Sequence, residues 1–481
     1  MTTTISGSYP AVNSDTDATI NGLTVGKGAG SIATNTAVGK SALSTNTTGA
    51  YNTAVGGADN NSISALQTNS TGASNTAVGN GSLGYNTGSY NTAVGFQSAN
   101  LNTSGGFLSG FGYVSLLNNT TGVRNSGFGA YTLSSNTTGG YNVAVGMQAL
   151  SGNTTASNNV AVGYQAAYSN TIGFKQVAIG NQALYSSNTS GGNSWVAIGA
   201  EAAWSFNSSG SNQAQVYIGA SAGYYNVTGI DNTYVGGYAG YYHTGGYNTA
   251  LGSGALLGAS GTSTGSSNTA IGYQAGKSIT SGGQNSILGY ASGAYVTTAT
   301  NNVILGQYAG GLSGINGLLT TGDQNVLIGY GATTSSSSGT RQVVVGGDYS
   351  VGKGNTTTYF PEGPAYQGNN SAAWSVASDQ RLKKNIVDNT IGLSAINGIQ
   401  VRNFEYRLPE EVTDFPQNQA IEKTGVQLGV IAQELQQVLP DCVKTESTGI
   451  MSVDATNITW HLINAVKELS AKVTALEARG T

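Results

Sequence analysis

Residues 75–95 read NTAVGNGSLGYNTGSYNTAVG, so the pentapeptide NTAVG occurs twice within this one stretch. The same pentapeptide stands at Asn35–Gly39 and at Asn52–Gly56. A relaxed form, with two small or apolar residues, then Val, Ile, Leu or Phe, and then Gly, continues the series. Its terminal glycines are Gly39, Gly56, Gly79, Gly95, Gly112, Gly129, Gly146, Gly163, Gly180, Gly199, Gly219, Gly236, Gly252, Gly272, Gly289, Gly306, Gly329 and Gly346. Ten of the seventeen gaps between them are 17 residues long and the others range from 16 to 23, which defines an internal repeat.

A repeat of this length is too short for helical hairpins, which need roughly 33 residues or more. It fits one coil of a parallel β-solenoid, or β-roll, with two short strands and two turns. About 18 such coils, stacked at the strand spacing, would span roughly 85 Å. The NTTG segments at Asn46–Gly49 and Asn136–Gly139 are expected to supply turn residues with positive φ. All six prolines lie outside residues 11–360, as expected for strands that pair on both sides.

The predicted strands are apolar on both faces, as Val177, Ala178 and Ile179 illustrate. A solenoid made of one chain should instead alternate between an apolar interior and a wet exterior. We expect one face to fill the roll and the other, often small, face to pack on sister chains. The small residues assigned to that second face are Ala37, Ala54, Ala197, Ala250 and Ala270. The alternative is a wider monomeric solenoid with a covering sheet.

The repeat resembles the head domains of trimeric autotransporter adhesins, whose coils carry a Val-Ala-Ile-Gly-x-x-Ala pattern. VAIG occurs at Val177–Gly180 and at Val196–Gly199, and Ala202 follows the second copy at the expected distance. The resemblance covers about residues 31–347. It implies a left-handed parallel β-roll, with three rolls packed about a common axis.

Composition excludes several classes of function. The 481 residues carry a net charge of −4 without a block of like charge, so nucleic acid is not an expected partner. A single cysteine, Cys442, excludes a disulfide framework and a Cys-based zinc site, and two histidines, His243 and His461, are too few for a histidine metal cluster. We therefore expect no metal and no cofactor. The N-terminus does not resemble a signal peptide and no run of 18 apolar residues occurs, so we expect synthesis in a cytoplasm and no membrane insertion.

Composition changes near residue 377. Residues 1–377 hold 15 charged residues, whereas the much shorter segment 378–481 holds 23. Glycine shows the opposite distribution, with 67 before residue 378 and 6 after it. We expect an N-terminal attachment segment at 1–30, a β-roll shaft at 31–347, a connector at 348–377 and a small α/β domain at 378–481. The predicted fold class is therefore mainly β.

The C-terminal segment contains two apolar-periodic stretches, Leu428–Leu439 and Ile458–Leu476. In the second, apolar residues are spaced 4, 3, 4 and 3 apart, which predicts a short coiled-coil seam at the end of an oligomeric bundle. These seam residues are Leu462, Val466, Leu469, Val473 and Leu476. Asp454 or Asn457 could cap the helix. The alternative is a plain amphipathic helix folded on its own domain.

The same segment resembles the self-cleaving intramolecular chaperone domain at the C-terminus of phage tail spikes, tail fibres and endosialidases. The residues that carry the resemblance are SDQRLKKNI at 378–386, FEYR at 404–407, GVIAQELQQVLPDCV at 429–443 and AVKEL at 465–469. The resemblance implies a domain that drives trimerisation of the upstream fibre and is then released by a Ser–Lys dyad. Ser378 and Lys383 match that dyad.

The residues are compatible with this chemistry. A serine hydroxyl needs an adjacent base, and lysine can serve when burial or nearby cations, here Arg381 and Lys384, lower its pKa. Five residues along a helix correspond to about 140°, so Ser378 must precede the helix, or the lysine must come from a neighbouring chain. Cleavage could fall at Ala377–Ser378 or at Ser378–Asp379. The alternative is an N-capped, solvated helix start.

Three functions remain open at this stage. The first is a phage tail fibre in the virion that is anchored to the tail or baseplate through its N-terminus and binds a host receptor, with a surface glycan as the default ligand. Aromatic residues in successive coils could form a stacking patch for that glycan, or could simply pack loops on neighbouring coils. These residues are Tyr224, Tyr225, Tyr241, Tyr242 and His243. The second is a tail spike that degrades glycans, for which Glu201 and Asp231 are the conceivable mid-roll carboxylates. The third is a bacterial trimeric surface adhesin. A phage tail fibre, the first of these functions, is not expected to act on external substrates.

Overall fold

The computed structural model describes residues 17–20, 23–58, 62–187, 194–206, 214–312, 314, 317–347, 349–352, 354–355, 358–359, 380–415, 420–421, 423–446 and 449–480. The chain divides into two units, Met1–Thr300 and Asn301–Thr481. Each unit is described by itself.

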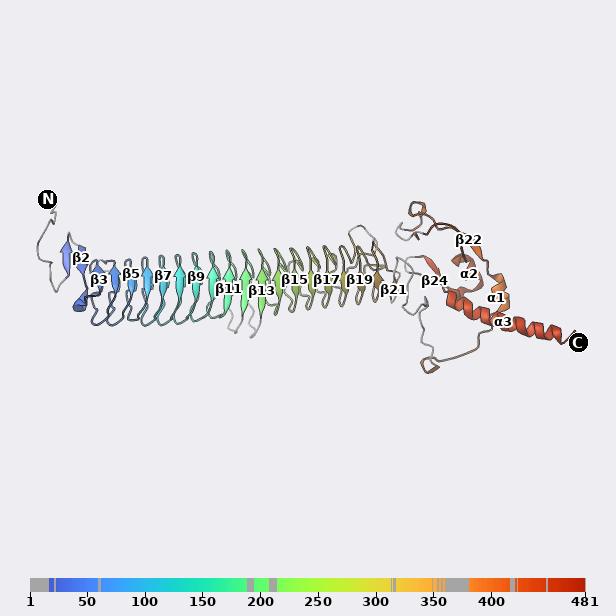
Figure 1. Cartoon of the computed structure of the whole chain (residues 1–481), viewed down its shortest axis with the longest axis horizontal. Helices are drawn as coiled ribbons and strands as arrows, with labels where there is room; N and C mark the ends of the chain where they lie inside the picture. The colour runs from blue at the N-terminus through green and yellow to red at the C-terminus, as the bar shows by residue number, and fades with distance from the viewer. Residues whose placement is uncertain are drawn as a thin grey trace. The chain divides into compact units, whose positions relative to one another are not determined.

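The first unit is a stack of parallel coils that follows a short hairpin (Figure 1). The hairpin pairs β1 (Ala18–Ile20) with β2 (Leu23–Gly26), and β2 pairs antiparallel with β3. From β3 onward each strand pairs in parallel and in register with the next. The strands are β3 (Thr36–Val38), β4 (Thr53–Val55), β5 (Thr76–Val78), β6 (Thr92–Val94), β7 (Ser109–Phe111), β8 (Ser126–Phe128), β9 (Val143–Val145), β10 (Val160–Val162), β11 (Gln176–Ile179), β12 (Trp195–Ile198), β13 (Gln215–Ile218), β14 (Thr233–Val235), β15 (Thr249–Leu251), β16 (Thr269–Ile271) and β17 (Ser286–Leu288).

The second unit begins with three more parallel strands of the same repeat, β18 (Val303–Leu305), β19 (Val326–Ile328) and β20 (Val343–Val345), and β21 (Thr358–Tyr359) pairs with β20. The predicted series of about 18 coils therefore corresponds to strands β3 to β20, fifteen of them in the first unit and three in the second. The mainly β solenoid class is confirmed.

The direction of the strand side chains differs from the prediction. The central residue of each strand points into the roll, so Ala37, Ala54, Ala197, Ala250 and Ala270 are buried. The assignment of these small residues to a contact with sister chains is therefore wrong. The inward residue and the wall that faces it are matched in size. A Cβ at Gly110, which replaces alanine in β7, would lie 2.6 Å from Ser98 Oγ, whereas the large inward Tyr217 faces Gly223, where a Cβ would lie 2.4 Å from the tyrosine ring.

The larger strand residues point outward instead. The last residue of each strand from β3 to β20 and the residue two positions before it are half-buried or exposed, and the last is always Val, Ile, Leu or Phe. Examples are Val145, Ile179 and Leu251, with 37–46% of their surface exposed. In a single chain this outward face of the strands is a continuous apolar stripe that faces solvent.

Each coil contains one strand rather than the two that were predicted. After β6, Gly95, Gln97 and Ala99 have φ of 133°, 52° and 49°, values that a β-strand does not allow. The turn segment still joins successive coils, because Ala99 N donates to Ser115 O (2.8 Å) and Leu101 N to Leu117 O (2.9 Å).

Two structural constraints require glycine at the position that ends each strand. Gly112 has a φ of 146°, and a Cβ there would lie 2.4 Å from the carbonyl oxygen of Gly129 in the next coil. The backbone conformation and the close approach of neighbouring coils both exclude a side chain. This explains why the repeat is punctuated by glycine.

Buried asparagines form ladders that run through the coils. Asn136 Nδ2 donates to Gly139 O (3.0 Å) in its own turn and to Asn119 Oδ1 (2.7 Å) in the preceding coil. Neither Asn136 nor Gly139 has positive φ, nor do Asn46 and Gly49, so the predicted role of the NTTG segments is wrong. Their asparagine satisfies buried backbone carbonyls, and their glycine is required because a Cβ at Gly139 would lie 2.2 Å from Ala156 O.

The C-terminal part of the second unit is a small α/β assembly, as predicted. Its elements are η2 (Gln380–Leu382), α1 (Leu393–Gly398), β22 (Arg402–Phe404), η3 (Pro409–Glu411), β23 (Gln427–Gly429), α2 (Ala432–Val438), η5 (Pro440–Cys442), β24 (Val443–Thr445), β25 (Met451–Val453) and α3 (Ala455–Glu477). β22 pairs with β23 and β24 with β25, both antiparallel.

The core of this assembly is built on Leu435, Leu439 and Cys442, against which α1 and the start of α3 pack. Asp454 caps α3 by accepting hydrogen bonds from Thr456 N (2.9 Å) and Asn457 N (3.3 Å), so of the two predicted caps Asp454 is the one used. Among the described residues, no helix is long and apolar enough to cross a membrane.

Candidate functional site

The predicted Ser–Lys dyad is described only in part. Ala377, Ser378 and Asp379 lie outside the described residues. Lys383 follows η2, its backbone N–H donates to Gln380 O (3.0 Å) and its side chain is exposed. Whether the two side chains meet stays a prediction.

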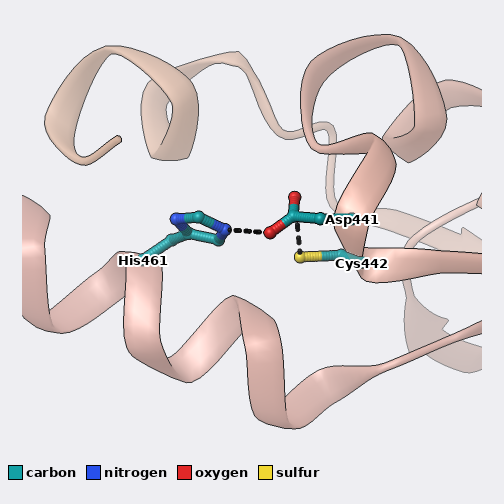
Figure 2. A group of neighbouring side chains, drawn as sticks. All are labelled: Asp441, Cys442 and His461. Atoms are coloured by element: carbon teal, nitrogen blue, oxygen red, sulfur yellow. Dashed lines mark hydrogen bonds and ion pairs between the residues drawn. The ribbon is translucent and has the colours of Figure 1, made fainter. Parts of the chain in front are cut away.

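A cluster that the sequence did not predict lies where α3 meets η5. Figure 2 shows the Asp441 carboxylate between the imidazole of His461 and the thiol of Cys442. His461 Nε2 is 2.8 Å from Asp441 Oδ2, and its Nδ1 is 3.2 Å from the carbonyl oxygen of Ile391. His461 and Cys442 are buried, whereas the side chain of Asp441 is half-exposed.

The electrostatics of the cluster favour a charged pair. The hydrogen bond that His461 donates to the Asp441 carboxylate raises the pKa of His461, burial opposes this, and the Ile391 carbonyl adds to the increase. Both ring nitrogens face acceptors, so the imidazolium form satisfies both. The result is an ion pair that ties α3 to η5 and to the segment preceding α1.

Cys442 does not act as a nucleophile in this arrangement. Burial, followed by the charges of Asp441 and Asp454, raises the pKa of the thiol to about 11, so it stays protonated at neutral pH. Its weak hydrogen bond goes to Asp441 (3.9 Å), and not to His461 as in a Cys–His pair. The potential ligand atoms of Asp441, Cys442 and His461 lie within 4.8 Å of one another, but a protonated thiol and a doubly hydrogen-bonded imidazole are poor metal ligands.

Sequence reasoning missed this cluster because it judged histidine and cysteine by count. Asp441 and Cys442 stand side by side in the LPDCV motif, but His461 lies twenty residues further along the chain. No spacing rule connects a residue in a short turn with one in the middle of a helix.

The outer surface of α3 is the second candidate site. One side of the helix packs on its own unit: His461 and Ala465 are buried, and Glu468 accepts a hydrogen bond from Leu393 N (3.2 Å). The seam residues predicted from the 4-3-4-3 spacing are open, with 45–66% of their surface exposed. They are Leu462, Val466, Leu469, Val473 and Leu476. Folding on its own domain therefore accounts for one side of the helix and leaves the seam without a partner in the single chain.

The tyrosine patch forms, but its rings cover one another. Tyr185, Trp204, Tyr224 and Tyr241 occupy equivalent positions in successive coils and stack with centroids 5.2–5.5 Å apart. Tyr225 stacks on Tyr242 at 5.2 Å. Their faces are thus used for packing between coils, and burial raises the pKa of Tyr224 and Tyr241. His243 lies inside the roll and does not belong to the patch. The arrangement favours the packing alternative.

The two conceivable glycosidase carboxylates do not act on one another in the described structure. Glu201 Oε2 accepts a hydrogen bond from Ser221 Oγ (3.3 Å), and Asp231 Oδ1 accepts one from Ala214 N (3.1 Å). Glu201 follows β12 and Asp231 precedes β14, so they lie toward opposite ends of their strands. No carboxylate pair of the kind that glycoside hydrolysis requires is found among the described residues of the first unit.

Comparison with protein families places a known domain at the C-terminus. Residues 378–444 match the family described as chaperone of endosialidase. The resemblance that SDQRLKKNI, FEYR and GVIAQELQQVLPDCV indicated is thereby confirmed, while AVKEL lies beyond the matched range. No curated protein matches the chain as a whole.

Proposed function

We propose that this chain, whose C-terminal segment carries a chaperone of endosialidase domain, is the subunit of a homotrimeric phage tail fibre that binds host cells. A β-solenoid followed by such a domain fits a tail fibre or tail spike. The chaperone domain would align three chains, and the repeat coils would then form the shaft. The resulting fibre would belong to the virion, be anchored through residues 1–30 and present the shaft to a host surface receptor.

The observation that carries this proposal is the exposed apolar seam of α3. Half-exposed Leu and Val side chains each contribute roughly 1 kcal/mol when their remaining surface is buried. The five seam residues therefore supply roughly 5 kcal/mol per chain to an association of helices. The seam repeats with the heptad spacing of a coiled coil, which supports other copies of α3 as the partner.

The outward stripe of the strands supports the same conclusion for the repeat region. Its Val, Ile, Leu and Phe residues follow one another in register from coil to coil, and a contiguous exposed apolar patch of this kind is typical of a contact with another protein chain. Three such stripes facing a common axis would bury it. The corrected side-chain directions thus change which residues make the contact: the large outward residues, and not the small inward ones.

We also propose that the chaperone domain is released after assembly by cleavage beside Ser378. Ser378 Oγ would attack a neighbouring peptide carbonyl while a lysine, Lys383 of the same or of a neighbouring chain, accepts its proton. If the lysine that acts as the base comes from a neighbouring chain, cleavage would be delayed until the trimer has formed. The reaction is a single self-cleavage, and no external substrate is involved.

Assembly and cleavage can be tested with paired variants. Leu469→Asp places a charge in the seam, whereas Ser470→Asp places the same charge one residue further on, at an exposed position outside it. We expect the first to reduce the trimer fraction in sedimentation velocity and the second to leave it unchanged. Equal behaviour of the two variants would show that the seam is not the contact.

Host binding is tested separately. The fluorescently labelled fibre should bind whole bacterial cells of a susceptible strain and reduce phage adsorption to them. A fibre that assembles as a trimer but binds no cells and blocks no adsorption would refute the receptor role while leaving the assembly role intact.

A further inference from the structure

Successive coils carry an exposed column of side chains five positions before the glycine that ends each strand. Between β6 and β11 this column consists of Tyr90, Phe107, Arg124, Tyr141, Asn158 and Lys175. All six residues have φ between 56° and 64°, so the same turn presents each of them in the same way. The three aromatic residues keep 50–58% of their surface exposed.

Arg124 is held between two rings of this column. Its guanidinium carbon lies 5.4 Å from the centre of the Phe107 ring and 5.1 Å from that of Tyr141, and Nη1 donates to Tyr141 Oη. Tyr90 in turn stacks on Phe107 with centroids 4.9 Å apart. The guanidinium is therefore oriented by cation–π contacts before any ligand arrives.

The charge around Arg124 is uncompensated. Residues 60–200 contain two charged side chains, Arg124 and Lys175, and no Asp or Glu at all. Among the described residues, the guanidinium donates a side-chain hydrogen bond only to Tyr141 Oη, so most of its five N–H donors face solvent. A pre-oriented arginine without a counter-ion is suited to an anion that arrives from outside.

We propose that this column binds a carboxylate-bearing polysaccharide that lies along the coils, which deepens the receptor role and rests on it. Arg124 would take one carboxylate in its planar fork, and Lys175, three coils or roughly 14 Å further on, a second one on the same polymer. The exposed tyrosines and Phe107 would contact sugar rings and hydroxyls between them.

Two other occupants fit the column less well. Two cations spread over six coils are too few to neutralise a nucleic-acid backbone. A sister chain packed on the column would bring its own residues 60–200, which offer no carboxylate to Arg124. A sugar acid supplies the missing charge.

The test compares two arginines at equivalent turn positions. Arg341 also stands five positions before the glycine that ends its strand, but its Nε donates to Gln324 Oε1 (3.1 Å), and among the described residues no aromatic ring makes a cation–π contact with it. The full-length protein, Arg124→Gln and Arg341→Gln are applied to immobilised polygalacturonate, with neutral dextran as the second matrix. We expect wild type and Arg341→Gln to bind polygalacturonate alike, and Arg124→Gln to bind roughly three- to tenfold more weakly, with the difference lost at high salt.

The conservative variant Arg124→Lys keeps the charge but not the fork, so it should recover only part of the binding. Equal binding of Arg124→Gln and wild type, or equal retention on polygalacturonate and dextran, would overturn the inference. A change of sedimentation coefficient in Arg124→Gln would show that the column is a contact between chains and would overturn it as well. If the wild-type protein is a trimer that binds cells but not polygalacturonate, the polysaccharide inference fails alone; if it is a monomer that binds no cells, the proposed function fails too.

Discussion

His243 is a buried imidazole at a turn position that asparagine occupies in the preceding coil, and this makes the roll sensitive to acid. It lies seven residues after the glycine that ends its strand, as do Asn136 and Asn226, and it is completely buried. Both ring nitrogens of His243 and Nδ2 of Asn226 lack hydrogen-bond partners among the described residues. The imidazole of His243 thus accepts no hydrogen bond from the Asn226 amide of the preceding coil.

The size of the acid destabilisation follows from the pKa of His243. Burial lowers the pKa of His243 to about 4, against an ordinary value of about 6.5. As pH falls from 7 to 4, the unfolded chain takes up a proton that the folded chain cannot accept, so stability is lost over this window. The free energy of unfolding is thereby lowered by about 3 kcal/mol per chain at pH 4 and below, relative to its value at pH 7.

The variant His243→Asn removes the titrating group and restores the amide used elsewhere in the ladder. At pH 7 the smaller side chain leaves a void that offsets the regained hydrogen bonds, so the informative quantity is the pH dependence. We expect hydrogen exchange of the amides in residues 236–252 to speed up between pH 7 and pH 4.5 in wild type, after correction for intrinsic rates, and to change much less in His243→Asn. Carboxylates titrate alike in both proteins, so their effect cancels when the two pH dependences are compared. Identical pH dependence in the two would refute the reasoning.

Further predictions concern the coils, the C-terminal cluster and cleavage. Gly112→Ala should destabilise the roll by at least about 2 kcal/mol, measured as a lower midpoint of thermal unfolding, because the Cβ meets a carbonyl oxygen in the next coil; an unchanged midpoint would contradict the close approach of the coils. Because its folded pKa is raised, His461 contributes stability that is complete below about pH 6.5 and is lost as pH rises through the folded pKa, so protease resistance of residues 380–480 should fall between pH 6 and pH 9 in wild type and stay flat in Asp441→Asn. A parallel fall in both proteins would exclude the ion pair as its cause. Wild type should yield a fragment ending near residue 377 on denaturing electrophoresis and Ser378→Ala should remain full length; a wild type that never cleaves would remove the proposed dyad. Incubation of the fibre with host capsule should release no reducing ends, and release that is lost in Glu201→Gln would restore the depolymerase alternative.

The repeat was predictable because its period can be read directly from residue spacing along the sequence. A glycine that recurs after 16 to 23 residues, most often 17, with an apolar residue before it indicates stacked coils of similar length, and Gly112 shows why glycine must recur. The C-terminal domain was predictable from its separate charge distribution, and the seam of α3 from its spacing. These features depend on sequence distance alone.

The direction of side chains was not predictable in the same way. A three-residue strand such as Val143–Val145 is apolar at all its positions, so the pattern does not reveal which face is inside. Small and large residues both occur at the inward position, from Ala144 to Tyr217, so residue size does not mark the inner face either. The role of Asn136 was missed for a similar reason, because a buried ladder of amides depends on the neighbouring coils and not on the turn that contains it.

The central claim is that three copies cover the seam of α3 and the outward stripe of the strands. The mass of the uncleaved Ser378→Ala protein, measured by light scattering during size-exclusion chromatography, tests it most directly. Three chains of 48.5 kDa predict about 146 kDa. A single species of 48.5 kDa that stays in solution with these surfaces exposed would contradict the account.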